Sequence, residues 1–132
     1  MENHFLEEET VTVRYIVTDV ASSVEFYTQV LGFKIDMNPP SGFAMLSRGN
    51  LRLMLNQPGA GGAGQSMPDG TTPSAGGWNR FQLQTRDINR AIAYLKSKKA
   101  RFRNEIVSGN AGKQILLLDP SENLIELVEP KK

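Results

Sequence analysis

The sequence predicts an α+β fold made of two βαβββ modules. Three features predict this class. The order strand, helix and three short strands occurs twice, and a Gly- and Pro-rich segment without periodic apolar residues separates the two occurrences. The apolar residues of the two helices also align when one half is laid over the other. We therefore expect a flexible N-terminal tail at 1–10, a first module at 11–56, a linker or lid at 57–77 and a second module at 78–130, all in one structural domain.

The first module begins with alternating side chains over 11–18, the pattern of a strand. Asp19 then opens a helix with one apolar face, and Ser22 with Glu25 offers a capping box one turn later. Gly32 suits the left-handed position that ends a helix. Three short strands complete the module, at 33–37, 43–48 and 51–55.

The second module repeats this order after the linker. We expect a strand over 78–86 and a helix that Asp87 caps. The basic run Lys96, Lys98 and Lys99 falls in the last turn of that helix, where cations are favourable. Three strands follow, at 102–107, 114–119 and 124–129.

The two helix starts fix an offset between the halves. Asp19 and Asp87 are 87 − 19 = 68 residues apart. At that offset three of four apolar positions in the first helix meet an apolar residue in the second. Repeated order and repeated pattern together indicate an internal duplication.

Composition excludes several classes of chemistry. The 132 residues include 15 basic and 14 acidic side chains, one histidine and no cysteine. Disulfides, thiolate metal sites and a Ser-His-Asp triad are therefore excluded, and the single histidine, His4, lies in the predicted tail. A net charge of +1 favours no nucleic-acid partner, and no apolar run is long enough to span a membrane. We expect a soluble cytoplasmic protein.

Two stretches resemble a known family. VRYIVTDVASSVEFYTQVLGFKI and ILLLDPSENLIELVEP are similar to the opening and closing segments of vicinal-oxygen-chelate proteins, which include glyoxalase I, bleomycin-resistance proteins, fosfomycin-modifying enzymes and extradiol dioxygenases. The resemblance covers about 11–130, and GGWNRFQLQ is similar to an uncharacterised bacterial subgroup described as glyoxalase-like. It implies two modules whose curved mixed sheets surround a cleft, and a homodimer in which both chains build each cleft.

The resemblance also implies where a divalent metal would be held. The four ligand positions of metal-dependent members fall on Thr12, Leu53, Arg80 and Glu126. Thr12 and Arg80 are separated by the same 68 residues as the helix starts, as equivalent positions should be. Only Glu126 carries a suitable ligand, and Arg80 is a permanent cation. We therefore expect no metal and no cofactor.

A guanidinium at a metal-ligand position suggests that Arg80 and Glu126 form an ion pair instead of binding a metal. If Arg80 and Glu126 face the same cleft, a bidentate ion pair satisfies the carboxylate. This pair has two interpretations that the sequence leaves open: a structural contact, or part of a ligand site. We expect the ligand-binding residues to be Thr12, Arg14, Leu53, Trp78, Arg80, Gln82 and Glu126.

Two functions follow from this site. The first is a metal-free protein that binds a small, partly apolar ligand with an anionic or carbonyl group. The alternative is a metal-independent lyase or isomerase with Glu126 as the acid or base. Tyr15 and Tyr27 could then act as proton donors, although both lie on apolar stripes typical of core residues. A divalent-metal-dependent glyoxalase or dioxygenase is disfavoured by the ligand set. The expected partners are a small molecule and a second copy of the chain, without nucleic acid or membrane.

Overall fold

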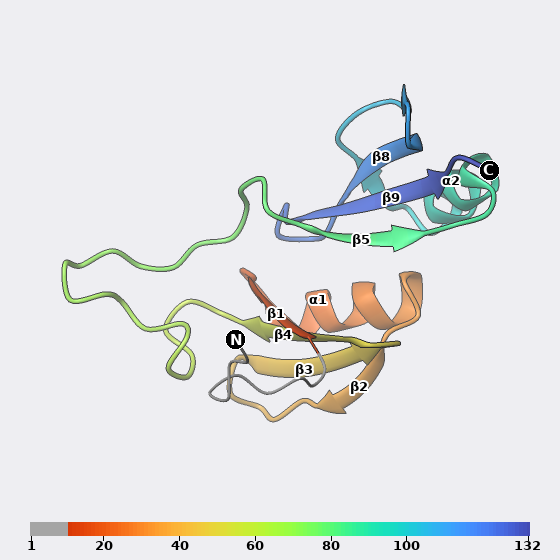
Figure 1. Cartoon of the computed structure of the whole chain (residues 1–132). Coiled ribbons are helices and arrows are strands. Elements are labelled where there is room, and N and C mark those ends of the chain that lie inside the picture. The colour runs from red at the N-terminus through yellow and green to blue at the C-terminus, as the bar shows by residue number, and fades with distance from the viewer. Residues whose placement is uncertain (1–10) are drawn as a thin grey trace, which may run out of the picture.

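A computed structural model describes residues 11–132, and it contains the two repeated modules (Figure 1). The predicted tail at 1–10, with His4, lies outside the described residues. No helix within 11–132 has the length and apolarity needed to cross a bilayer.

The first module forms a four-stranded sheet in the order β1-β4-β3-β2. β1 pairs with β4 in parallel, whereas β2–β3 and β3–β4 are antiparallel. One face of this sheet packs on the helix and includes the fully buried Leu46, Leu53 and Leu55. We call the other face the open face of the first sheet. The elements are β1 (Val11–Ile16), α1 (Val20–Glu25), the π-helical turn η1 (Phe26–Val30), β2 (Lys34–Met37), β3 (Phe43–Arg48) and β4 (Leu51–Asn56).

The first helix begins at Asp19 as predicted, because its Oδ2 accepts a hydrogen bond of 3.0 Å from the Ser22 amide. The expected Ser22–Glu25 capping box is wrong, since that amide is already used by Asp19. The helix widens into η1, and Phe33 donates its amide to the Tyr27 carbonyl at 2.9 Å. Gly32 reverses the chain there with φ of 75°, which confirms its predicted place at the end of the helix.

The second module forms a sheet in the order β5-β9-β8-β6, with β7 also paired to β8. β5 and β9 are parallel neighbours, as β1 and β4 are in the first module. Ile88 and Leu95 of the helix are buried in the same cluster as Ile115, Leu117 and other residues of one sheet face. The opposite face is the open face of the second sheet. The elements are β5 (Phe81–Gln84), α2 (Ile88–Ser97), β6 (Arg101–Phe102), β7 (Val107–Gly109), β8 (Gly112–Leu118) and β9 (Leu124–Pro130).

Two predicted strands of the second module differ from the structure. The strand predicted over 78–86 is limited to β5, and the strand predicted over 102–107 is broken between β6 and β7. At the break, Arg103 donates its amide to the Leu116 carbonyl, and the Asn104 side chain then accepts from the Leu116 amide, each at 2.9 Å. The Asn104 side chain thus takes the place of a backbone acceptor in the ladder. The chain leaves the sheet after this point and pairs with β8 again from Val107.

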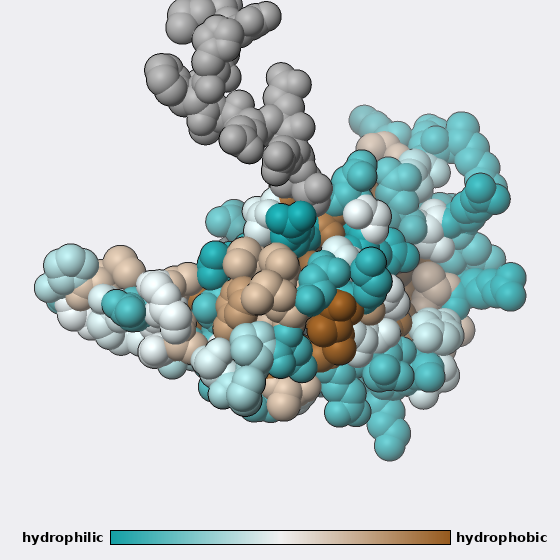
Figure 2. All heavy atoms as spheres, turned by 90° about the horizontal axis from the view of Figure 1, so that it is seen from below, coloured by the Kyte–Doolittle hydropathy of each residue, from teal (hydrophilic) through white to brown (hydrophobic). Residues whose placement is uncertain are grey.

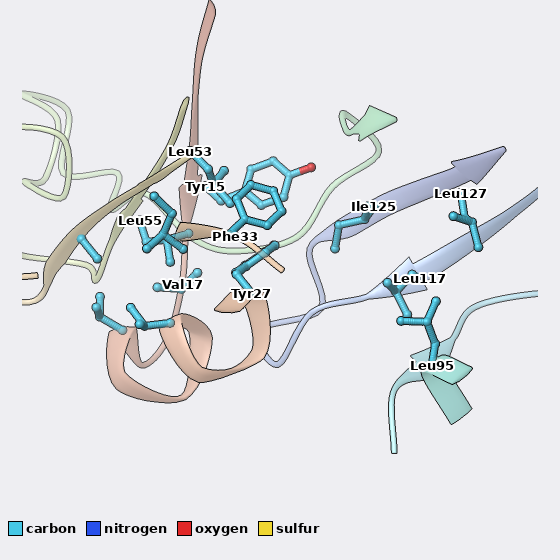
Figure 3. Close-up of a cluster of buried hydrophobic side chains, with 14 of the residues drawn as sticks. Tyr15, Val17, Tyr27, Phe33, Leu53, Leu55, Leu95, Leu117, Ile125 and Leu127 are labelled. Carbon is cyan, nitrogen blue, oxygen red and sulfur yellow. The ribbon is translucent and has the colours of Figure 1, made fainter. Parts of the chain in front are cut away.

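Buried apolar side chains of both modules gather on the helix-bearing side of each sheet (Figure 3), and aromatic and polar contacts join the modules there. The rings of Tyr15 and Phe81 lie 5.5 Å apart, and the Tyr15 hydroxyl donates to the Leu124 carbonyl at 2.6 Å. The buried Tyr27 hydroxyl donates to Asp119 Oδ2 at 2.8 Å. Burial is the main cause that raises the pKa of Tyr15 to about 12 and that of Tyr27 well above its ordinary value. Both tyrosines are core residues.

The segment between the modules has neither helix nor strand over 57–80 and extends away from the body of the protein (Figure 1). It is held at its ends: the Asn56 side chain donates to the Ala60 carbonyl, and the Gly76 amide donates to Asn123 Oδ1 at 2.8 Å. Seen from below, the surface has a central apolar patch bordered by hydrophilic residues (Figure 2).

Candidate functional site

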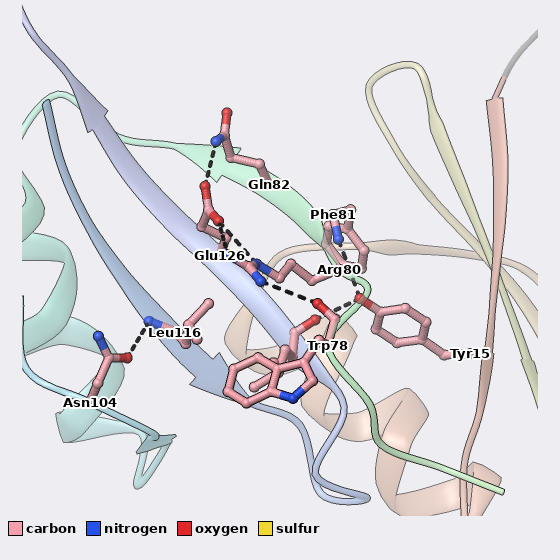
Figure 4. Close-up of polar contacts among 9 residues, drawn as sticks. Tyr15, Trp78, Arg80, Phe81, Gln82, Asn104, Leu116 and Glu126 are labelled. Atoms are coloured by element: carbon pink, nitrogen blue, oxygen red, sulfur yellow. Dashed lines mark hydrogen bonds and ion pairs between the residues drawn. The ribbon is translucent and has the colours of Figure 1, made fainter. Parts of the chain in front are cut away.

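Three of the predicted site residues meet on the open face of the second sheet (Figure 4). Gln82 of β5 and Glu126 of β9 are direct partners in the parallel register. Successive side chains of a strand point to opposite faces. Glu126 therefore lies opposite the core face that holds its neighbours Ile125 and Leu127. Arg80, just before β5, points to the same side as Gln82 and reaches Glu126.

The Glu126 carboxylate is held by both neighbours. Its Oε1 accepts from Nε of Arg80 at 3.0 Å and from Nη2 at 2.8 Å, and its Oε2 accepts from Nε2 of Gln82 at 2.6 Å. The predicted ion pair is therefore present, although both guanidinium nitrogens converge on a single oxygen instead of bridging the two. The side chains are 30% and 12% exposed for Arg80 and Glu126. The pair is thus partly shielded from water, and it remains accessible on the Arg80 side.

The surroundings set the protonation of Glu126. Burial alone would raise its pKa, but the hydrogen bonds from Gln82 and Arg80, together with the Arg80 charge, outweigh burial and hold the pKa below its ordinary value. The carboxylate is therefore ionised at neutral pH. A base with a lowered pKa and both oxygens occupied is poorly suited to removing a proton.

Trp78, two residues before Arg80, adds to this cluster. Its carbonyl accepts from Nη1 of Arg80 at 3.2 Å, and the residue is 62% exposed. The Arg103 guanidinium lies over the indole ring, 4.4 Å from the centroid, which is a cation–π contact. The sequence did not indicate Arg103, because alternation over the predicted strand made it an ordinary outward residue. In the structure Arg103 still pairs with Leu116, the partner of Glu126, so Arg103, Glu126 and Gln82 share one row of the open face.

The first sheet holds a related pair on its own open face. Arg14 is the direct partner of Met54, and its Nη2 lies 3.4 Å from the Met54 sulfur, while its Nη1 donates to Asn56 Oδ1 at 2.6 Å. By register, Arg14–Met54 is equivalent to Gln82–Glu126. Thr12, one row away, pairs with Arg52 on the same face.

This equivalence corrects one site prediction. The residue that corresponds to Glu126 in the first module is Met54 and not Leu53. Leu53 is fully buried on the core face, so it cannot line the cleft as predicted. A shift of one residue in a strand moves a side chain to the opposite face, and the sequence alone did not fix that register.

The predicted site residues therefore fall into three groups. Trp78, Arg80, Gln82 and Glu126 are together on the second sheet, Thr12 and Arg14 lie on the first sheet, and Leu53 is in the core. Among residues 11–132, no hydrogen bond or ion pair joins the first group to the second. The modules contact each other through their helix-bearing sides. Within residues 11–132, the first sheet of the same chain therefore does not face the cluster on the second sheet.

The donor set does not fit a divalent metal. Arg80 places a fixed positive charge against the one carboxylate, and the equivalent positions in the first module carry a hydroxyl and a thioether. Hard divalent ions need several oxygen ligands. No group of three or more His, Cys, Asp or Glu side chains able to hold a metal occurs in the described part of the chain.

A hollow of about 650 Å³ lies elsewhere, between α2 and the bulged segment after β6. Its apolar lining comes from Ile92, Phe102 and Ile106, with Lys96 and Glu105 among its polar residues. Arg103, whose guanidinium lies over Trp78, also contributes to its lining, whereas Arg80 and Glu126 do not.

Comparison with known proteins gives the family. The sequence model of the Glyoxalase/Bleomycin resistance protein/Dioxygenase superfamily matches residues 4–127, and the chain belongs to this superfamily. No curated protein matches the chain.

Solved structures share the fold at low sequence identity. TnmS3, an antibiotic binding protein from Streptomyces sp. CB03234, is 19% identical with a TM-score of 0.71, over 98% of this chain and 100% of that one. Lactoylglutathione lyase from Agrobacterium tumefaciens is 14% identical with a TM-score of 0.70, over 92% and 93%. A superfamily member from Sphaerobacter thermophilus DSM 20745 is 21% identical with a TM-score of 0.70, over 94% and 98%.

Proposed function

We propose that this superfamily member binds a small, partly apolar ligand with a carbonyl or anionic group on the open face of its second sheet, without a metal. The observation that carries the proposal is the cluster of Arg80, Gln82 and Glu126 beside the exposed Trp78 ring. A fixed cation, an amide and an exposed indole, which carries the Arg103 guanidinium over its ring, are suited to orient such a ligand.

The hydrogen-bonding capacity of the cluster is only partly used. The Arg80 guanidinium has five N–H donors, of which three are used for Glu126 and the Trp78 carbonyl. The remaining donors can reach a ligand oxygen, because the Arg80 side chain is 30% exposed. Gln82 donates to Glu126 through its amide nitrogen, so its carbonyl oxygen can accept from the ligand.

The same geometry favours binding over catalysis. Glu126, the expected acid or base of the alternative lyase or isomerase, is an ionised carboxylate with three hydrogen bonds. Tyr15 and Tyr27 are buried, and their hydroxyls donate to protein acceptors. We therefore do not propose the alternative enzyme.

Structural neighbours give a second, weaker support. TnmS3 is named an antibiotic binding protein, and its fold covers nearly this whole chain. We propose the same general role, binding of a small molecule, for this chain. The identity of 19% supports no choice of ligand.

We further propose a cytoplasmic homodimer. Within residues 11–132, the first sheet of the same chain does not face the second-sheet cluster. The equivalent open face of the first sheet is available to a second copy. A two-fold pairing would place the first sheet of one copy opposite the second sheet of the other. Analytical ultracentrifugation at micromolar concentration should then show twice the chain mass, whereas a single-chain mass would contradict the pairing.

A screen followed by product analysis tests the function. Thermal shift is measured against small aromatic and aliphatic carboxylates and ketones, with the matching amines as controls. Stabilisation by carboxylates or ketones and not by amines is expected. Mass spectrometry after prolonged incubation should recover each hit unchanged. A hit that is chemically converted would contradict a pure binding role, and a screen in which only amines stabilise would contradict the proposed ligand chemistry.

A further inference from the structure

Three methionines form one row across the open face of the first sheet. Met37, Met45 and Met54 come from three adjacent strands. Met45 is the direct partner of the other two, and Arg14 continues the row on β1 as the partner of Met54. We call the three methionines the methionine row. The sequence does not reveal it, because the row forms only when a bulge in β2 brings Met37 opposite Met45.

The core does not account for this row. The core lies on the other face of the same strands, where Ala44, Leu46 and Leu53 are fully buried. Met45 and Met54 are half-buried, and Met37 is 50% exposed. A flexible, polarisable side chain left at the surface of a sheet is typical of adaptable binding surfaces.

Cations flank the row. The next row of the same face is Thr12, Arg52, Ser47 and Lys34, so Arg52 and Lys34 lie one row from the methionines, while Arg14 ends the methionine row itself. None of the three pairs with a carboxylate of residues 11–132. This charge favours an anionic ligand.

The position of Arg14 decides between a soft metal ion and an aromatic ring. Thioethers bind soft cations such as Cu(I), but they also contact aromatic rings favourably. The Arg14 guanidinium lies 3.4 Å from the Met54 sulfur and is held there by Asn56. A fixed positive charge at that distance opposes a metal cation, and it favours an electron-rich ring with a negative substituent.

We propose that the methionine row is a platform for a flat aromatic anion, with Arg14 on the anionic substituent. Three strands at about 4.8 Å spacing give a nearly planar strip about 10 Å wide, comparable with a ring system of two or three fused rings. The inference rests on the proposed function. It assigns the ring system of the proposed ligand to the first sheet of one copy, opposite Arg80 of a second copy, which would meet the polar group of that ligand.

The test uses anthracene-2-sulfonate, an anion with three fused rings, as the probe and the full chain labelled with ¹³C at the methionine methyl groups. Ring currents should shift the methyl signals of Met37, Met45 and Met54. Met67, which is 46% exposed in the linker, is the internal control and should not shift. Decane-1-sulfonate, an anion without a ring, is the control compound. Shifts at Met67 alone, or equal shifts with both compounds, would overturn the proposal.

Matched variants measure the affinity of the same probe. Met45→Leu keeps an apolar side chain without sulfur and should weaken binding by about two- to tenfold, and Arg14→Gln by about tenfold. Met67→Leu should leave the affinity unchanged. Equal affinity for Met45→Leu, Arg14→Gln and wild type would also overturn the proposal. The two proposals fail separately: an absent methionine shift removes this inference and leaves the second-sheet site, which the screen tests with its own compounds.

Discussion

At the scale of single residues, the central feature is the replacement of a metal-binding pattern by an ion pair. Only Glu126 of the expected ligand set remains a carboxylate, and Arg80 with Gln82 satisfies both of its oxygens. The pair could be predicted because the family resemblance places metal-ligand positions on Arg80 and Glu126, and the repeat agrees by relating Arg80 to Thr12. Gln82 was also expected to line the cleft, but its contact with Glu126 and the position of Arg103 opposite Leu116 follow from the strand register, which the sequence pattern does not fix.

Two isosteric substitutions compare this pair with an exposed one. Glu126→Gln places an amide N–H₂ group against donors from Arg80 or Gln82, so the free energy of unfolding should fall by about 1–3 kcal/mol. Glu122 is the matched control, because its carboxylate is 67% exposed and lies 3.7 Å from Arg101. Glu122→Gln should change stability by about 0.5 kcal/mol or less. Urea unfolding measures both, and equal losses would contradict the account.

The lowered pKa of Glu126 predicts a dependence of stability on pH. A carboxylate with a lower pKa in the folded state stabilises the fold above its unfolded pKa, near 4.5. That contribution disappears as the pH falls through the folded value. The stability difference between wild type and Glu126→Gln should therefore be constant from about pH 7 to pH 5 and shrink at lower pH. A difference that stays constant down to about pH 3 would show that the charge of Glu126 is not responsible.

At the scale of elements, the two helices show how far the internal repeat holds. Asp19 and Asp87 both cap their helices, as their equivalent positions predicted. The helices end differently: Ala100 donates to the Leu95 carbonyl, five residues back, but Phe33 donates to the Tyr27 carbonyl, six residues back. The π-helical turn therefore accommodates one extra residue, so Gly32 and Lys99 occupy equivalent left-handed positions. Apolar spacing predicts a helix but does not distinguish this widened turn.

The two helix ends predict opposite effects of substitution. Lys99 has φ of 64°, a conformation that is unfavourable for residues with a Cβ atom, so Lys99→Gly should stabilise the protein by about 0.5–1 kcal/mol. Gly32→Ala should destabilise it by about 1 kcal/mol. The Cβ atom of an alanine at position 32 would meet no atom within 4 Å, so the loss of stability would come from the backbone conformation alone. Thermal unfolding measures both, and a destabilising Lys99→Gly would contradict this explanation.

At the scale of the whole molecule, the sequence predicts the two modules and their class, but not how they face each other. Apolar alternation located most strands, and apolar spacing together with the capping residues Asp19 and Asp87 located the helices. The contacts that join the modules link residues as distant as Tyr27 and Asp119, or Thr18 and Ser121, and no local pattern encodes such pairs. Leu53 was placed in a cleft for a different reason, a strand position misassigned by one residue, whereas the packing of the first sheet places it in the core.

The most direct test of the central claim, that the second-sheet cluster binds the ligand, is the affinity of one screening hit for matched arginine variants, measured by isothermal titration calorimetry. Arg80→Gln should weaken binding about tenfold or more, because it removes the charged donor of the cluster. Arg101→Gln, which removes an exposed arginine outside the cluster, should bind as wild type does. Equal affinities of wild type and Arg80→Gln would contradict the account.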